Sequence, residues 1–374
     1  MKVTRFGQAA VVLSVAALAL TACGSDNATG APATTPAAGG SEAPVSAVTG
    51  TLTGVGASAQ NAAMDAWKVG FSAAHSGASV QYSPDGSGAG RKAFLAGAAQ
   101  FAGSDASLKD DEYEEAKQVC GPDGAFNIPA YISPIAVAYN LEGVDELKLD
   151  AETIAKIFKQ EITTWNDPAI AAHNEGVELP DTAITVVHRN DESGTTENFT
   201  EYLEQAAGDA WGFEASGEWP SDIQAENAKG TSGVVSTASS TAGAITYADA
   251  SAVGNLGTVS VKVGEDYTKL SSEAAAKAVE AATPVEGRAD IDMSLVLDRN
   301  TSESGAYPIV LVSYHIYCTS YKDQATVDLV KAFGEYIVSE QGQQDAAESA
   351  GSAALSETLR EKAIAAIETI TVAS

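Results

Sequence analysis

An apolar strand, a turn of small residues and a helix follow one another directly at several places in this chain, and this unit constrains its fold most. The apolar run Ile184–Val187 reads as a strand, and the small polar residues Ser193–Thr196 come shortly after it. Phe199, Tyr202 and Leu203 then recur at helical spacing. Alternation of such strands and helices along the chain, with no detectable internal repeat, predicts an α/β fold.

The turn at residues 193–196 is a candidate anion site. Its backbone N–H groups are expected at a helix N-terminus, where N–H groups lack carbonyl partners and the helix dipole is positive. Arg189 precedes the turn and can donate two parallel hydrogen bonds to an oxyanion. An ordinary N-cap that binds no ligand is the alternative interpretation of Ser193.

A second unit of this kind lies near the start of the globular region. Thr51–Val55 reads as a strand, Gly56–Ala59 as a small turn, and Met64, Trp67 and Phe71 then recur at helical spacing. The chain therefore presents another helix N-terminus directly after a strand.

Two shorter segments extend the pattern. Val80–Tyr82 reads as a strand, and the glycine-rich turn Asp85–Gly90 after it lets the backbone approach a ligand closely. The segment Phe101–Ala106 then places one carboxylate, Asp105, after a short apolar run. Asp105 is either a ligand group or the N-cap of a following helix. Several strand-to-helix turns of one kind suggest a shared pocket.

Five short motifs in this order resemble the phosphate-binding proteins of the phosphate-specific ABC uptake system. They are GVGAS at residues 54–58, DGSGAGRKAF from residue 85, FAGSDASL from residue 101, RNDESGTT from residue 189 and YPIVLVSY from residue 307. The resemblance covers most of residues 51–374. This chain departs from the family pattern at Glu192, where the family usually has glycine, so a negative side chain beside the anion site must point away.

The resemblance implies an α/β, two-lobe, periplasmic-binding-protein-like fold with two hinge crossovers, near Ser133-Pro134 and near Pro308. Lobe I is expected at residues 51–132 plus 312–374, and lobe II at residues 133–311. Strands expected at residues 128–131, 135–139, 244–247 and 309–316 complete two sheets, and a helical segment from residue 325 to residue 370 covers one of them.

By the same resemblance, ligand groups come from both lobes, so that bound phosphate bridges the cleft and favours closure. The closed protein then delivers phosphate to the permease subunits of the ABC transporter. Asp191 is expected to orient Arg189 through a carboxylate–guanidinium pair, or else to be only a helix-start carboxylate. No cofactor is implied. The expected ligand residues are Ser58, Ala59, Ser87, Gly88, Asp105, Arg189, Ser193, Gly194 and Thr195.

The N-terminus reads as a lipoprotein signal peptide over residues 1–22. Lys2 and Arg5 precede an apolar run from residue 9 to residue 20, and Leu20-Thr21-Ala22-Cys23 resembles a bacterial lipoprotein processing site. Lipid on Cys23 would anchor the protein to the outer face of the cytoplasmic membrane. Residues 23–50, rich in Ala, Gly, Ser, Thr and Pro, form a flexible tether with a reach of ~30 Å. A plain signal peptide or short membrane anchor is the alternative.

Charge, histidine spacing and cysteine content bear on three further features: a nucleic-acid partner, a metal site and a disulfide. Without Lys2 and Arg5, 19 basic residues stand against 50 acidic ones, so nucleic acid is not an expected partner. The histidines lack metal-ligand spacing, and no metal site is expected. After export, Cys120 and Cys318 are most simply a disulfide, the alternative being two buried free thiols.

Three other functions fit parts of the sequence. Gly54–Ala59 satisfies the dinucleotide pattern G-x-G-x-x-A after a strand, with Asp85 where a ribose-binding acid could sit, although an exported protein meets little nucleotide cofactor. An exported phosphatase would be the enzyme alternative, but no G-x-S-x-G motif is present and we expect no catalytic activity. Binding of another oxyanion, such as sulfate, is the third.

Overall fold

A computed structural model of the protein describes residues 48–374. The expected signal peptide, the lipidation site at Cys23 and nearly all of the tether lie outside the described residues. Within residues 48–374 no helix has both the length and the apolar character needed to cross a membrane.

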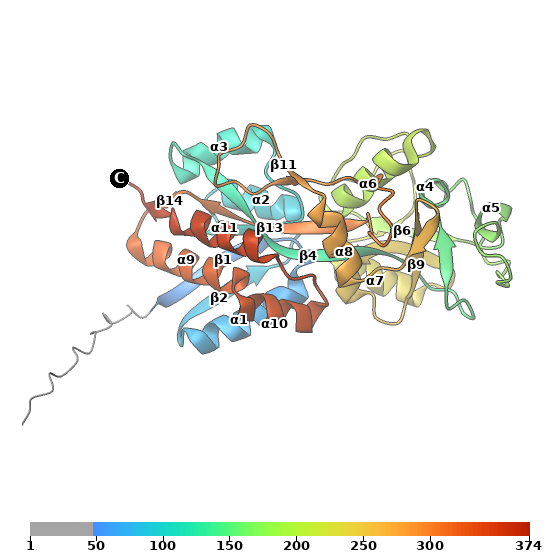
Figure 1. The fold of residues 1–374 in the computed structure, drawn as a ribbon, viewed down its shortest axis with the longest axis horizontal. Helices are drawn as coiled ribbons and strands as arrows, with labels where there is room; N and C mark the ends of the chain where they lie inside the picture. The colour runs from blue at the N-terminus through green and yellow to red at the C-terminus, as the bar shows by residue number, and fades with distance from the viewer. Residues whose placement is uncertain (1–47) are drawn as a thin grey trace, which may run out of the picture. The chain divides into compact units, whose positions relative to one another are not determined.

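Alternating strands and helices build residues 49–120, which together with the C-terminal strands and helices of residues 310–372 we call the first lobe (Figure 1). The N-terminal elements are β1 (Thr49–Gly56), α1 (Asn61–Ala74), β2 (Gly77–Ser83), α2 (Ser87–Leu95), β3 (Phe101–Ser104) and α3 (Asp110–Cys120). The C-terminal elements are β13 (Val310–Cys318), β14 (Ser320–Tyr321), α9 (Gln324–Val338), α10 (Glu340–Ala350), α11 (Glu357–Glu368) and β15 (Thr371–Val372).

A second group of strands and helices, which we call the second lobe, follows the long strand β4 (Ala125–Tyr139). Its elements are β5 (Leu147–Leu149), α4 (Ala151–Phe158), α5 (Pro168–Ala171), β6 (Thr185–Arg189), α6 (Gly194–Ala207), the 3-10 turn η1 (Gly208–Ala210), β7 (Glu226–Ala228), α7 (Gly230–Ser240), β8 (Ala244–Asp249), the 3-10 turn η2 (Ala250–Ala252), β9 (Gly257–Val263) and β10 (Asp266–Thr268). Helix starts are marked by caps, as where the Asp150 carboxylate accepts from Thr153 N at 2.8 Å before α4.

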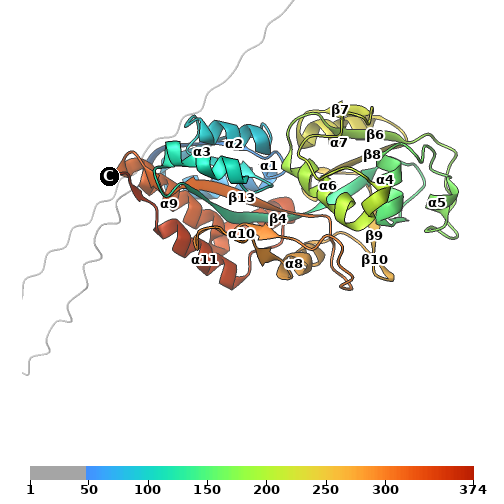
Figure 2. The same cartoon turned by 90° about the horizontal axis from the view of Figure 1, so that it is seen from above.

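One sheet of 11 strands runs through both lobes, with the order β2-β1-β3-β13-β4-β8-β6-β7 along its main path. Strand β4 connects its two parts, because residues 125–134 pair with β13 and residues 135–139 pair with β8. Helices α2 and α3 lie on one side of β13 and β4, and α9 and α11 lie on the other (Figure 2). Strands β1, β2 and β3 in the first-lobe part of this sheet and β6 in the second-lobe part lead into the turns and the loop that carry the expected ligand residues.

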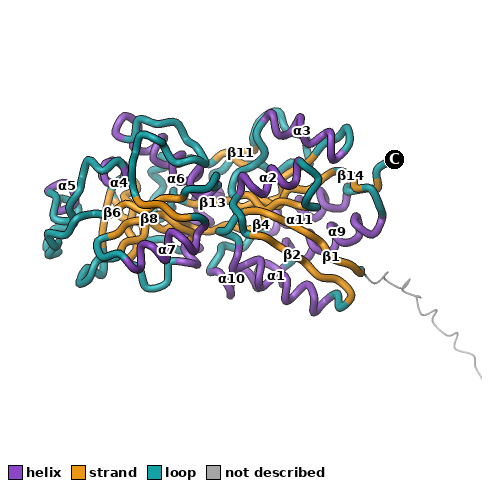
Figure 3. The backbone as a smooth tube through the Cα atoms, turned by 180° about the vertical axis from the view of Figure 1, so that it is seen from behind, coloured by secondary structure: helices purple, strands orange, loops and turns teal. Residues whose placement is uncertain are grey.

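The two strands predicted at residues 128–131 and 135–139 are a single strand, β4, and the two predicted sheets are continuous through it. Pro134 lies inside β4 opposite Val310 of β13. The strand continues through this proline, and the next backbone N–H, that of Ile135, donates to the Ile309 carbonyl at 2.6 Å. The helical segment predicted from residue 325 is three helices, α9, α10 and α11, seen from behind in Figure 3.

The chain returns from the second lobe along the first before entering β13. Helix α8 (Ser272–Glu280) packs on β4 and β13, and β11 (Thr283–Pro284) pairs with β12 (Leu295–Val296). Between these strands, the Asp292 carboxylate accepts from Tyr113 Oη of α3 at 2.5 Å. Residues assigned to lobe II from the sequence thus contact the first lobe, and the predicted lobe boundaries stay a prediction.

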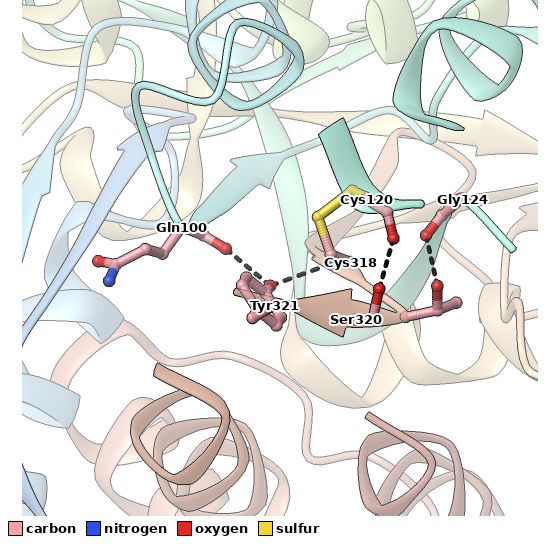
Figure 4. The surroundings of a disulfide bond; sticks show 7 residues. Gln100, Cys120, Gly124, Cys318, Ser320 and Tyr321 are labelled. Carbon is pink, nitrogen blue, oxygen red and sulfur yellow. Dashed lines mark hydrogen bonds between the residues drawn. A yellow bond between two sulfur atoms is a disulfide. The ribbon is translucent and has the colours of Figure 1, made fainter. Parts of the chain in front are cut away.

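A disulfide joins Cys120, at the end of α3, to Cys318, at the end of β13 (Figure 4). The two residues are 198 positions apart in the sequence, and their Cα atoms are 4.8 Å apart. Ser320 Oγ donates to the Cys120 carbonyl at 2.8 Å, and Tyr321 Oη accepts from Cys318 N at 3.0 Å (Figure 4). The pairing expected from an oxidising compartment is present in the structure.

Candidate anion-binding site

The first turn of the site lies between β1 and α1 and carries Ser58 and Ala59. Ser58 Oγ accepts from Thr231 N at 3.0 Å and lies 2.9 Å from Thr231 Oγ1, at the start of α7 in the second lobe. Ala59 is buried beside it. A cleft of about 550 Å³ opens next to this turn and is lined from both lobes, by Ser58 and Asp85 on one side and Lys229 and Thr231 on the other.

Glycines in the predicted dinucleotide motif serve strand packing. Gly54 and Gly56 lie inside β1. A Cβ on Gly54 would fall 2.2 Å from the Phe101 ring, and one on Gly56 would fall 1.9 Å from the Gly103 carbonyl oxygen. Both glycines are therefore required by the contact of β1 with β3, without any nucleotide.

The second turn is the N-terminus of α2, which starts at Ser87, inside the segment predicted as a glycine-rich turn. Ser87 is buried, and its Oγ accepts from Asp105 N at 3.1 Å. Gly88 N donates to the Glu192 carbonyl at 3.2 Å, and a Cβ on Gly88 would fall 2.3 Å from the Glu192 carboxyl carbon. Glycine at this position lets the second lobe approach the first turn of α2.

Asp105 lies in the loop after β3 and is 3% exposed. Helix α3 begins later, with Lys109 at its N-cap position, so the alternative interpretation of Asp105 as a helix cap is wrong. One carboxylate oxygen accepts from Ser313 Oγ at 2.5 Å, and the other accepts from Thr195 Oγ1 of α6 at 3.0 Å. Burial raises the pKa of Asp105, and these two hydrogen bonds, with the charges of Arg189 and Arg91, limit the rise.

Arg189 ends strand β6 and is 2% exposed. Its Nε donates to Asp191 Oδ1 at 2.7 Å and its Nη2 donates to Asp191 Oδ2 at 2.5 Å, which is the predicted orienting pair. Burial alone would raise the pKa of Asp191, but the hydrogen bonds and charge of Arg189 hold it below its usual range. Gly230 N, at the start of α7, also donates to Asp191 Oδ1 at 3.0 Å.

The third turn is the N-terminus of α6. Ser193 is its N-cap and accepts from Thr196 N at 3.2 Å, while the first helical residues are Gly194 and Thr195. Ser193 can cap the helix and also bind an anion, because its hydroxyl oxygen accepts from Thr196 N while its own proton can be donated to a ligand. A Cβ on Gly194 would fall 2.7 Å from Ser87 Oγ, so this turn and the start of α2 are in direct contact.

Glu192, where the chain departs from the family pattern, turns its carboxylate to the first lobe. Its two oxygens accept from Arg91 Nη2 at 2.9 Å and from Lys92 Nζ at 2.6 Å, both on α2. Arg91 is buried and also pairs with Glu112. The carboxylate also lies against Gly88, an expected ligand residue, so its orientation relative to a bound anion stays a prediction.

Eight of the nine expected ligand residues thus lie on three helix-start turns and the loop after β3, and the ninth, Arg189, ends strand β6. Sequence reasoning missed Thr231, Gly230 and Ser313, which contact Ser58, Asp191 and Asp105 respectively. Thr231 and Gly230 lie at the start of α7 but belong to none of the sequence motifs that predicted the site. Ser313 did carry a signal, as the one polar side chain between the apolar run of YPIVLVSY and its last tyrosine. Within the described residues, no cluster of His, Cys, Asp and Glu side chains fits a metal ion.

Comparison with known proteins places this geometry in a family. Residues 41–341 match the model of the PBP superfamily domain. The chain is 39% identical over 348 residues to phosphate-binding protein PstS 3 of Mycobacterium tuberculosis, covering 89% of this chain and 90% of that protein. It is 35% identical over 381 residues to phosphate-binding protein PstS2 of Mycobacterium bovis, covering 99% and 100%.

Solved structures support the same fold. A periplasmic phosphate-binding protein determined with bound phosphate superposes with a TM-score of 0.69 at 20% identity, covering 84% of this chain and 93% of that one. The phosphate-binding protein of Stenotrophomonas maltophilia gives a TM-score of 0.65 at 21% identity, covering 85% and 94%. This protein therefore has the two-lobe fold of periplasmic binding proteins and belongs to the PstS family of the PBP superfamily.

Proposed function

We propose that this protein captures inorganic phosphate between its two lobes, at Ser58, Ala59, Ser87, Gly88, Asp105, Arg189, Ser193, Gly194 and Thr195, and delivers it to an ABC permease. The observation that carries the proposal is that both lobes meet at buried Asp105, which is hydrogen-bonded to Ser87 of the first lobe and Thr195 of the second. The turn at Ser58 contacts Thr231, and the neighbouring Gly230 N donates to the carboxylate that orients the Arg189 guanidinium. Helix N-termini supply N–H donors to an oxyanion, and the guanidinium supplies charge.

Arg189 is suited to bind an anion while it is held by Asp191. A guanidinium carries five N–H donors in a planar fork. Among residues 48–374, its side-chain hydrogen bonds use only Nε and Nη2, both toward Asp191. The remaining donors, with the hydroxyls and backbone N–H groups of the turns, supply a binding set for a tetrahedral oxyanion.

Asp105 makes phosphate the better candidate than sulfate. Phosphate near neutral pH carries at least one proton, whereas sulfate carries none. A carboxylate accepts a hydrogen bond from that proton but meets only lone pairs on sulfate, so it selects by repulsion. A site built for sulfate would gain nothing from a buried carboxylate at this place.

Calorimetric titration of the purified protein with phosphate and with sulfate tests the proposal. We expect tight binding of phosphate and none of sulfate, and tight binding of sulfate would contradict the assignment. The same preparation should not hydrolyse a chromogenic phosphate ester, and its ultraviolet spectrum should show no bound nucleotide. Turnover of the ester would favour the phosphatase alternative.

We further propose that the protein acts outside the cytoplasm, anchored through lipid on Cys23. The leader-like residues 1–22 support this location, and one phosphate-binding protein of the same fold is described as periplasmic. Metabolic labelling with a radioactive fatty acid should mark the wild-type protein, and Cys23→Ala should remove the label and release the protein from membranes. An unlabelled wild-type protein would contradict the anchor.

A further inference from the structure

A chain of buried hydrogen bonds reaches Asp105 from inside the first lobe. It consists of Tyr317, His315 and Ser313 on β13 and Gln60 before α1, and we call it the β13 relay. The three β13 residues are two positions apart, so they project from one face of the strand. All four side chains are fully buried. Buried polar groups of this kind are retained only when they are hydrogen-bonded, and each bond then has a definite direction.

The Tyr314 carbonyl sets the first direction, because a carbonyl oxygen only accepts. Gln60 Nε2 lies 3.2 Å from this oxygen and 2.6 Å from Ser313 Oγ, so the amide nitrogen of Gln60 faces both and donates to both. The amide oxygen of Gln60 must then face the other way, toward His315.

The orientation of the Gln60 amide determines which ring nitrogen of His315 carries the proton. His315 Nε2 lies 3.1 Å from Gln60 Oε1, an acceptor, so Nε2 carries the proton. Burial lowers the pKa of His315 to about 3, and the ring is therefore neutral, with Nδ1 unprotonated. Nδ1 accepts from Tyr317 Oη at 3.0 Å. Phe101, whose ring centroid is 5.0 Å from that of His315, closes one side of this apolar surrounding.

Ser313 is the residue through which the relay contacts the ligand site. Ser313 Oγ accepts from Gln60, so its own proton must go to an acceptor, and among the described residues that acceptor is Asp105 Oδ1 at 2.5 Å. A proton on Oδ1 would face the proton of Ser313. The relay therefore holds Oδ1 as an acceptor, while Oδ2 faces α6 and the anion turns through Thr195.

We propose that Ser313, directed by Gln60 and His315, is a positioning residue that keeps Asp105 a hydrogen-bond acceptor, so that the site selects protonated oxyanions over fully deprotonated ones. The inference rests on the proposed function and extends it to residues that never touch the anion. Without the donation from Ser313, the pKa of Asp105 rises further. A protonated Asp105 can donate to sulfate, and the discrimination is lost as the pH falls.

Other charged and titratable groups face Asp105 and must be constant in any test. They are Arg91 from α2 and Arg189 from β6, which lower the pKa of Asp105, and Tyr82 from β2, whose own pKa is raised by burial and by Asp105. Substitution of Ser313 leaves all three in place. It also removes only one oxygen atom from a buried strand position.

The test compares Ser313→Ala with Ser260→Ala, a buried strand serine on β9 in the second lobe, and with Asp105→Asn. Phosphate and sulfate affinities are measured by calorimetry at pH 5.5 and pH 8, with thermal unfolding as the check on folding. We expect Ser313→Ala to reduce the phosphate-to-sulfate affinity ratio ~10-fold at pH 5.5, the size of one lost hydrogen bond to a charged group, and less at pH 8. Ser260→Ala should keep the wild-type ratio, and Asp105→Asn should lose discrimination at both pH values.

A wild-type ratio in Ser313→Ala at both pH values would overturn the relay alone, whereas wild-type protein that ignores phosphate would overturn the proposed function and this inference with it. A second measurement needs no variant. Nitrogen-15 NMR of the His315 ring in wild-type protein should show Nε2 protonated and Nδ1 unprotonated at neutral pH. The opposite tautomer would reverse the directions derived above and overturn the proposal.

Discussion

At the scale of single residues, Arg189 combines two roles that a substitution separates. Arg189→Ala removes a charged fork from the site, and we expect the dissociation constant for phosphate to rise by at least ~100-fold. It also removes both hydrogen bonds from the guanidinium to the largely buried Asp191 carboxylate, which keeps the one from Gly230 N, at a cost of ~1–3 kcal/mol in unfolding free energy. Calorimetry and thermal unfolding measure the two effects.

Asp191→Asn is the matched control for that experiment. It keeps the guanidinium but removes the charge that orients it, so the loss of affinity should be smaller than in Arg189→Ala. Equal affinity of Arg189→Ala and wild type would show that the anion binds elsewhere.

Glu192 is the residue at which this chain departs from its family, and its ion pairs join the lobes. Glu192→Gln should weaken phosphate binding about fivefold, because fewer molecules are closed when the pair with buried Arg91 is lost. Arg91 keeps Glu112 as a partner, so the fold should tolerate the change. The pair with Lys92, which is largely exposed, contributes little. Stopped-flow measurement of phosphate release should show the loss as faster dissociation.

The effect of Glu192 should depend on pH. Burial alone would raise the pKa of Glu192, but Lys92 and Arg91 hold it below its usual range. The stabilisation of the closed lobes by the Glu192 ion pairs is therefore present above the ordinary glutamate pKa and is lost as the pH falls through the lowered value. Glu152→Gln, which breaks a pair within α4 only, is the control and should bind as wild type. Tighter binding by Glu192→Gln would mean that its charge opposes the anion instead of closing the lobes.

At the scale of elements, the disulfide ties the end of α3 to the end of β13. Cys120→Ser with Cys318→Ser frees a segment of 198 positions, and the loss of this crosslink should lower the unfolding free energy by ~4–5 kcal/mol and the midpoint by roughly 5–8 °C. Phosphate affinity should change little, because the bridge joins the ends of α3 and β13 and neither cysteine is an expected ligand residue. Mass spectrometry of non-reduced peptides should find the bridge in the exported wild-type protein, and two free thiols would refute it.

At the scale of the whole described unit, ligand binding and lobe contact are coupled. Ser58 meets Thr231, Gly88 meets Glu192 and Asp85 meets Lys229 across the lobes. An anion that bridges the same turns stabilises this arrangement, and phosphate at about 1,000 times its dissociation constant should add ~4 kcal/mol to the unfolding free energy. Thermal unfolding with phosphate should show the rise, and sulfate at equal ionic strength should not.

Hydrogen exchange locates that effect. Amides at the starts of α2 and α7 should exchange more slowly with phosphate than without it, since both helix starts contact the other lobe. Uniform protection of the whole chain, with no excess at these turns, would argue against closure as the source of the stabilisation.

The sequence alone determined the local units of this protein. Apolar patterns predicted β1, β6 and β8 to within two residues of their bounds and located part of β2, because burial on one face imposes a spacing that can be read without the fold. The helix-start turns followed from small hydroxyl residues after strands, whereas the pair of Arg189 with Asp191 was one of the expectations that accompanied the family resemblance. These features depend on neighbours in the chain.

Only the tertiary structure decided what those units meet. Pairing of β4 with β13 and then with β8 made one strand of two predicted ones, because a buried ladder overrides the proline inside it. The partners of Asp105, Glu192 and Ser58 lie 208, 101 and 173 positions away, respectively. Contacts over such separations produce no periodic pattern in a single sequence, because they arise from the packing of strands and lobes. The same packing brings the β13 relay to Asp105.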